Sequence, residues 1–131
     1  MNQCKLALVP LQQNIKLQCE DGSKAADATL YRQLVGSLIY LTTIRPDLDY
    51  AVNMLSQFMS NPLEGHWNVA KNVLRYLQGI VDYGIIYTDS SDVRLAGSAY
   101  SDWAGNVDDR RSITGYAFNL GSGVITWSSK K

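Results

Sequence analysis

The 131-residue sequence is poor in the residues from which many catalytic and metal sites are built. His66 is its only histidine, and its only cysteines, Cys4 and Cys19, stand at no spacing typical of a metal site. No serine stands in a nucleophile elbow, and no glycine-rich motif for phosphate binding occurs. The sequence therefore argues against acyl-transfer hydrolase chemistry. We expect His66 to be structural or at the surface and both cysteines to be reduced.

Net charge and long apolar runs are also lacking. Twelve basic and twelve acidic side chains balance, so no overall positive field attracts nucleic acid, and such binding would need a local patch. No stretch approaches the roughly 20 apolar residues of a membrane span, and the apolar run at residues 6–9 is too short for a secretory signal. We therefore expect no membrane partner and, by default, an intracellular location in cytoplasm or nucleus.

The hydrophobic share of 46% is typical of a globular domain, and three stretches show the period of an amphipathic helix. Asp27 or Thr29 can cap the first helix, and Pro46 both ends it and can occupy the first turn of the second. The pattern predicts helices within residues 29–82. Residues 1–28 are polar and without a period, which predicts an extended lead-in.

Beyond residue 82 the period changes from helical to alternating. Short runs rich in β-branched and aromatic residues occur at residues 83–88, 93–101, 112–121 and 123–129. Residues 83–131 are therefore predicted to form strands. Helices followed by strands indicate an α+β fold, with three helices followed by an antiparallel meander.

We expect the core to draw apolar side chains from both the helices and the strands. The expected core residues are Leu34, Leu38, Ile39, Val52, Leu55, Phe58, Leu74, Leu77, Ile85, Tyr116, Phe118, Ile125 and Trp127.

A loop rich in aspartate and arginine separates two of the expected strands. Asp108 and Asp109 look like the paired metal-binding carboxylates of a polymerase palm, but Arg110 and Arg111 follow at once and would neutralise them. The simpler interpretation is a solvated loop that balances its own charge.

Two pairs of cations are candidates for nucleic-acid binding. Lys71 and Arg75 stand four residues apart on the third expected helix and could contact two phosphates, and Arg110 and Arg111 form a second pair. Equally, they could belong to an ordinary hydrated helix face and loop.

Five long motifs together indicate a family. They are LYRQLVGSLIYLTTIRPDLDYAVNMLSQFMSNP, HWNVAKNVLRYLQG, DYGIIYT, SDWAGNVDDRRSITGYAF and GSGVITWSSKK. In this order and spacing they closely resemble the Pol polyprotein of Ty1/copia-type retrotransposons. The resemblance implies the end of a reverse transcriptase, its thumb or connection part, followed by the first strands of a ribonuclease H-like sheet. The parent protein copies RNA into DNA and cleaves the RNA of RNA/DNA hybrids, using two Mg²⁺ ions held by carboxylates.

One position departs from the pattern that the resemblance implies. The family carries a catalytic aspartate two residues before the aspartate that matches Asp102, and Tyr100 stands at that position here. A phenol is neutral at physiological pH and is a poor substitute for a carboxylate toward Mg²⁺. Asp102 could serve only if the site were shifted by about 7 Å along the strand.

We therefore expect a chain that is catalytically inactive on its own, with no metal and no cofactor. The family's second catalytic carboxylate would follow Lys131, and a second polypeptide could supply the missing parts. The alternative is a domesticated remnant that acts as a small protein-interaction or nucleic-acid-binding module. That module would bind a partner through the open sheet face or the helix of Lys71 and Arg75. In the parent context the expected partner is an RNA/DNA hybrid, and the open sheet face is a predicted route to self-association of the chain.

Overall fold

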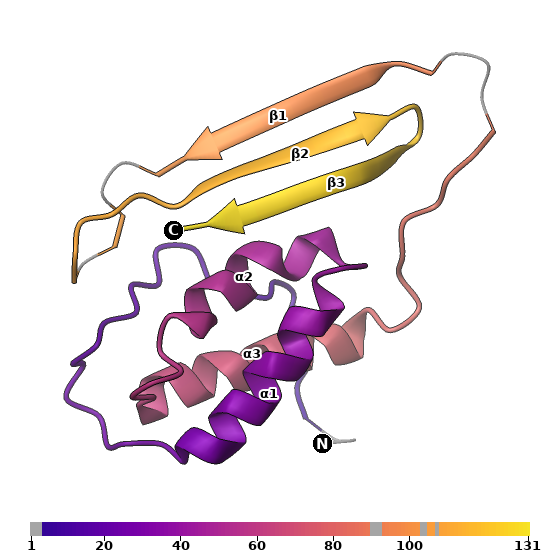
Figure 1. The fold of residues 1–131 in the computed structure, drawn as a ribbon. Helices are drawn as coiled ribbons and strands as arrows, with labels where there is room; N and C mark the ends of the chain where they lie inside the picture. The colour runs from indigo at the N-terminus through magenta and orange to yellow at the C-terminus, as the bar shows by residue number, and fades with distance from the viewer. Residues whose placement is uncertain (1–3, 90–92, 103–104, 107) are drawn as a thin grey trace. The chain divides into compact units, whose positions relative to one another are not determined.

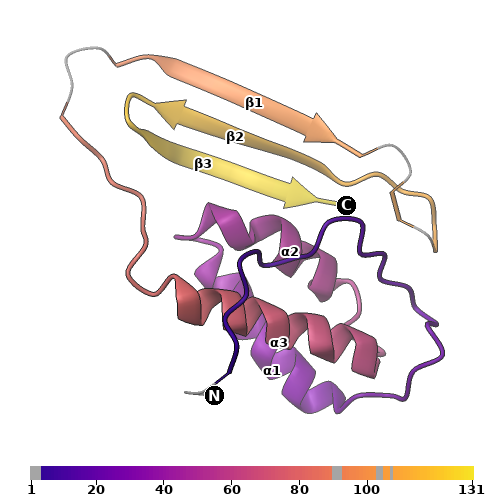
Figure 2. The ribbon, with the colours of Figure 1, turned by 180° about the vertical axis from the view of Figure 1, so that it is seen from behind.

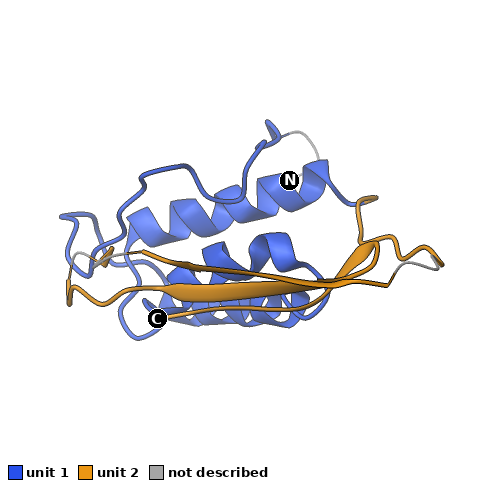
Figure 3. Cartoon of the chain, turned by 90° about the horizontal axis from the view of Figure 1, so that it is seen from above, with its two compact units in different colours: residues 1–81 blue, residues 82–131 orange. Residues whose placement is uncertain are grey.

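The computed structural model describes residues 4–89, 93–102, 105–106 and 108–131. The chain divides into two compact units, residues 1–81 and 82–131, which Figure 3 shows in blue and orange. Each unit is described by itself.

The first unit contains three helices, as the sequence predicts (Figures 1 and 2): α1 (Ala28–Leu41), α2 (Pro46–Ser56) and α3 (Glu64–Gly79). Asp27 is the N-cap of α1, because its carboxylate accepts hydrogen bonds from the backbone N–H groups of Thr29 and Leu30 at 2.8 and 3.0 Å. Pro46 is the first residue of α2, where a missing N–H costs no helical hydrogen bond. Each helix contacts the other two.

The core of this unit lies between the three helices. Its fully buried side chains include Tyr31, Val35, Leu38, Leu48, Val52, Leu55 and Val73. The expected core residues Leu38, Val52, Leu55 and Phe58 are buried, and Leu34, Leu74 and Leu77 are half-buried.

The expectation for Ile39 was wrong, because its side chain is 43% exposed. Tyr31, Val35 and Leu38 form the buried stripe of α1. At about 100° per residue, Ile39 lies beyond the edge of that stripe on the side facing water.

The lead-in has neither helix nor strand over residues 4–27, apart from one isolated bridge between Ala25 and Leu63. It is nevertheless held against the helices. The Asn72 side chain of α3 donates to the carbonyls of Val9 and Pro10, and Leu17 is buried.

The second unit is a three-stranded antiparallel meander of β1 (Leu95–Ser101), β2 (Thr114–Leu120) and β3 (Gly123–Lys130), in the order β1-β2-β3. The predicted α+β class is therefore confirmed. A bulge between Phe118 and Asn119 interrupts the register of β2 with β3, whereas β1 and β2 pair without a shift.

Residues 83–88 were wrongly predicted to be a strand, since they form no ladder. They reach the β2–β3 hairpin mainly through side chains: the Tyr87 hydroxyl donates to the Val124 carbonyl, and the Thr88 N–H donates to Ser122 Oγ at 2.8 Å. The rings and methyl groups of Tyr87 and Ile85 cover Gly123.

The strands contribute less to a core than we expected. Tyr116, Phe118 and Ile125 are 42%, 38% and 46% exposed, while Ile85 and Trp127 are half-buried. A side chain on a sheet face is buried only where a second layer packs on that face, and alternation alone does not reveal whether one does.

Candidate functional site

Tyr100 lies near the end of β1 and links all three strands. It pairs with Gly115 of β2, which in turn pairs with Ser129 of β3. The Tyr100 ring lies across Gly115, where a Cβ would stand 2.3 Å from ring carbon Cε1. Beyond the glycine, the Tyr100 hydroxyl donates to Ser129 Oγ at 2.6 Å. The phenol thus ties the first strand to the third.

Asp102 follows β1 directly and closes the base of the aspartate-rich loop. Its backbone N–H donates to the carbonyl of Ile113 at 3.0 Å, and its carboxylate Oδ1 accepts from the N–H of Ile113. Ile113 itself is buried. Trp103 and Ala104 of the SDWAG motif lie outside the described residues.

Asn106 organises the turn that follows. Its side-chain oxygen accepts from the N–H groups of Asp108 and Asp109 at 2.9 and 3.2 Å, and its carbonyl accepts from the N–H of Arg110 at 3.1 Å. Arg110 has a φ of 58°, in the left-handed region of backbone conformation, and the chain changes direction at this residue. Asn106 is buried, so its amide is a structural element of this loop.

Asp109 is neutralised by two cations that follow it in the sequence. Its Oδ2 lies 2.8 Å from Lys131 Nζ and 3.8 Å from Arg111 Nε. The hydrogen bond from Lys131, with help from Arg111, lowers the pKa of Asp109. The sequence analysis did not single out Lys131. The meander could have indicated it, because antiparallel pairing brings the end of β3 beside the start of β2.

These residues do not fit a magnesium site of the kind that the resemblance implies. The Tyr100 hydroxyl is committed to Ser129, one oxygen of Asp102 to the backbone of Ile113, and Asp109 to Lys131. Among the described residues, no three histidine, cysteine, aspartate or glutamate side chains gather closely enough to hold a metal ion.

The four candidate cations fall into two separate pairs. Lys71 and Arg75 are half-buried neighbours on α3, and Lys71 Nζ lies 6.0 Å from the centre of the Trp67 ring, at the outer limit of a cation–π contact. Arg110 and Arg111 are exposed neighbours in the loop of the second unit. The two pairs therefore belong to different compact units.

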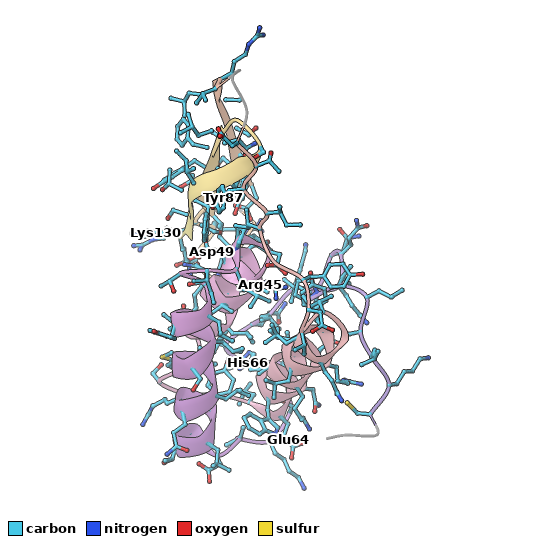
Figure 4. The ribbon with its side chains drawn as sticks, turned by 90° about the vertical axis from the view of Figure 1, so that its right-hand side faces the viewer. Arg45, Asp49, Glu64, His66, Tyr87 and Lys130 are labelled. Atoms are coloured by element: carbon cyan, nitrogen blue, oxygen red, sulfur yellow. The ribbon has the colours of Figure 1, made fainter. Side chains whose placement is uncertain are left out.

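His66 is a buried structural residue of the first unit (Figure 4). It stands at the third position of α3, where its Nδ1 accepts from the N–H of Leu63, the N-cap residue, at 3.0 Å. Because Nδ1 is an acceptor, the proton is on Nε2, which lies 2.9 Å from the carbonyl of Gln18. The ring stacks on Phe58 with 3.9 Å between centres.

Comparisons with known proteins extend these observations. The chain is 47% identical over 127 residues to the retrovirus-related Pol polyprotein from transposon RE2 of Arabidopsis thaliana, which covers 97% of this chain and 9% of the polyprotein. It is 42% identical over 101 residues to the corresponding protein from transposon TNT 1-94 of Nicotiana tabacum, covering 76% of this chain and 8% of that protein. It is also 47% identical over 102 residues to the secreted RxLR effector protein 161 of Plasmopara viticola, covering 77% and 72% of the two chains.

No family model and no solved structure matches the chain. The relatives and the fold together define an α+β segment of a retrotransposon polyprotein. The chain belongs to the Pol polyproteins of Ty1/copia-type retrotransposons, and it spans about a tenth of the length of the Pol relatives it matches. In the described residues, each helix is too short or too polar to cross a membrane.

Proposed function

We propose that this chain is the part of a copia-type Pol that joins the reverse transcriptase to the ribonuclease H-like domain. The helices of residues 29–82 would be the thumb or connection end of the polymerase, and residues 83–131 the first strands of the nuclease sheet. Two features support the assignment. The chain divides into compact units between Val81 and Asp82, and an antiparallel meander begins soon after that division.

We further propose that the chain alone does not cleave the RNA of RNA/DNA hybrids. The observation that carries this proposal is Tyr100, a phenol at the position where the family pattern has an aspartate, hydrogen-bonded to Ser129 at 2.6 Å. Asp102, the nearest carboxylate along the chain, is held by the backbone of Ile113. The chain thus lacks a carboxylate at the position of the family's aspartate, and the backbone already engages one oxygen of the carboxylate nearest to it.

The test is hydrolysis of a labelled RNA/DNA hybrid by the whole chain in Mg²⁺, beside a complete ribonuclease H as positive control. We expect no cleavage above the buffer blank. Metal-dependent cleavage that disappears in Asp102→Asn would overturn the proposal, because it would place the activity in this loop.

A pair of matched variants examines the tyrosine itself. Tyr100→Asp introduces the carboxylate, and Tyr100→Phe removes only the hydroxyl, so both lose the bond to Ser129. We expect both to remain inactive, with folding of each verified by circular dichroism. Hydrolysis by Tyr100→Asp alone would show that the chain holds the rest of a nuclease site, contrary to the proposal.

A second candidate function is that of a small binding module, and the open sheet favours it. Leu95, Tyr116, Phe118 and Leu120 are exposed apolar residues on one face of the meander. A shallow hollow of 570 Å³ lies at one end of that face, lined among others by Tyr116 and Lys130. These features suit a protein surface or a nucleic acid.

Nucleic-acid binding is tested by fluorescence anisotropy with an RNA/DNA hybrid over a salt series. Phosphate contacts would give an affinity that falls steeply with salt. Replacing Lys71 and Arg75 by alanine, and separately Arg110 and Arg111, assigns the contacts to the helical unit or to the loop. Unchanged affinity in both double variants would exclude these four residues as the interface.

A further inference from the structure

The last turn of α3 extends beyond the buried part of that helix. The fully buried side chains of α3 end at Val73, and the helix continues to Gly79. The last four carbonyls of a helix have no donor within it, and a left-handed glycine or a basic side chain in the last turn commonly supports them. The last turn of α3 contains no basic residue, and its C-cap residue Ile80 has a φ of −132°, outside the left-handed region. The end of α3 is therefore supported from elsewhere in the unit.

Arg45 donates to this end from the start of another helix. It is the N-cap residue of α2, and Figure 4 labels it. Its Nη1 donates to the carbonyl of Ile80 at 3.4 Å. A cation near the C-terminus of a helix also interacts favourably with the helix dipole. Arg45 thus takes the part that a basic residue in the last turn of α3 would have.

Asp47 fixes the guanidinium in place. Arg45 Nε donates to Asp47 Oδ1 at 2.9 Å and Nη2 donates to Oδ2 at 2.8 Å, a two-point pairing. The Tyr76 hydroxyl of α3 donates to the same Oδ2 at 2.9 Å. Asp47 also stands in the first turn of α2, where the helix dipole favours a negative charge. The pair therefore joins the start of α2 to the end of α3 and complements the dipoles of both.

The lead-in also contacts the C-terminal part of α3. The N–H of Ala7 donates to the carbonyl of Arg75 at 3.5 Å, and Cys4 Sγ donates to the side-chain oxygen of Gln78 at 3.0 Å. The first of these bonds is long, and the second engages a side chain. The guanidinium contact, by contrast, engages the backbone where the helix ends.

We propose that the Arg45–Asp47 pair keeps the last turn of α3 wound and thereby sets the length of the connection between the two compact units. The units divide directly after this turn, between Val81 and Asp82. A helical residue advances the chain by about 1.5 Å and an extended residue by about 3.3 Å, so unwinding one turn of roughly four residues would lengthen the connection by about 7 Å. The proposal uses contacts inside the first unit and is independent of the assignment to Pol.

Amide hydrogen exchange of the whole chain, followed residue by residue by NMR, tests the local role. In Arg45→Met, which keeps an apolar stem, we expect the amides of residues 76–80 to exchange about tenfold faster, the effect of losing a hydrogen bond from a charged group. The amides of Leu55 and Val73, which are buried, should keep their protection. Unchanged exchange at residues 76–80 would overturn the proposal. Equal acceleration at Val73 would also overturn it, because Arg45 would then stabilise the unit as a whole.

Two further variants separate the pair from a general effect of arginine. Arg32→Met is the matched control, because Arg32 Nε also donates to a backbone carbonyl, that of Met59, at 2.9 Å. It should leave the exchange of residues 76–80 unchanged, and an acceleration equal to that of Arg45→Met would contradict the proposal. Arg45→Lys keeps the charge but loses the two-point pairing with Asp47, so its exchange should lie between those of the parent chain and Arg45→Met.

A distance measurement tests the length of the connection. Spin labels at Lys71→Cys and Gly84→Cys flank the last turn, in a background with Cys4→Ser and Cys19→Ser, and a Cβ at Gly84 meets no atom within 4 Å. Because helix ends open at low free-energy cost, a tenfold change makes the unwound state a visible population. Pulsed electron paramagnetic resonance should show a population longer by up to about 7 Å when Arg45→Met is added. An unchanged distance distribution would refute the link between this pair and the connection.

Discussion

Replacing His66 by alanine should strongly destabilise the helical unit. The side chain is fully buried and makes three kinds of contact at once. It accepts from the N–H of Leu63, donates to the carbonyl of Gln18 and stacks on Phe58. One residue thus ties the start of α3 to the lead-in and to Phe58, which follows the end of α2.

The magnitude follows from the groups that the substitution leaves behind. A buried N–H or C=O without a partner costs about 1–3 kcal/mol, and the loss of an aromatic stack costs about 0.5–1.5 kcal/mol. Allowing for water that enters the space left by the ring, we expect a loss of roughly 3–5 kcal/mol. This is a large share of the about 5–15 kcal/mol that typically stabilises a domain.

Urea unfolding followed by far-ultraviolet circular dichroism measures this loss. His66→Gln is the matched variant, because glutamine at the third helical position can still accept from the N–H of Leu63. It should recover about 1 kcal/mol of the loss. Two results would refute the reasoning: a cost below about 1 kcal/mol for His66→Ala, or equal costs for the two variants.

Three further substitutions examine the same unit. Asp27→Ala should cost about 1 kcal/mol in urea unfolding, because α1 loses its N-cap hydrogen bonds. Tyr31→Phe should cost about 1 kcal/mol by the same measurement, because the buried hydrogen bond of its hydroxyl to the carbonyl of Leu55 at 2.8 Å is lost while that carbonyl keeps the N–H of Phe58 at 3.1 Å. Burial acts to raise the pKa of Asp47, but the hydrogen bond and charge of Arg45 help to outweigh it, so the net pKa is lowered. Asp47 therefore adds stability at pH values above its ordinary pKa of 3.8, and that stability is lost as the pH falls through the lower folded value. The measurement is the urea midpoint at a series of acid pH values. In Asp47→Asn this midpoint should fall less steeply as the pH is lowered than it does in the parent chain.

The helical half could be predicted because its signals are local. The period of apolar residues, the capping aspartate at Asp27 and the proline at Pro46 each act within a turn or two of helix. Ile39 was wrongly predicted to be in the core, because the period of apolar residues locates the centre of the buried face of a helix better than the edges of that face.

The strand half was harder because a strand depends on partners far along the chain. Residues 83–88 have the composition of a strand, yet they contact the hairpin mainly through the side chains of Tyr87 and Ile85. The contacts of Tyr100 with Ser129 and of Asp109 with Lys131 depend on the register of the meander. The sequence contained each of these residues, but their pairing follows only once the strands are aligned.

Aromatic rings repeatedly cover glycines in this sheet. Tyr100 lies over Gly115, Phe118 over Gly97, and Tyr87 over Gly123, each within 2.5 Å of where a Cβ would stand. Such rings fill the gap that a glycine leaves in a strand and fix the register of its neighbours.

The tyrosine at position 100 therefore has a structural consequence beyond the loss of a carboxylate. An aspartate there would be too short to cover Gly115 or to reach Ser129. The hydrogen bond from the Tyr100 side chain that joins β1 to β3 would then be lost. In Tyr100→Phe the ring remains and only the hydroxyl bond is lost. If the ring is what matters, Tyr100→Phe should unfold close to the parent chain while Tyr100→Asp unfolds at clearly lower urea. Equal midpoints for the two variants would instead assign the contribution of Tyr100 to its hydroxyl.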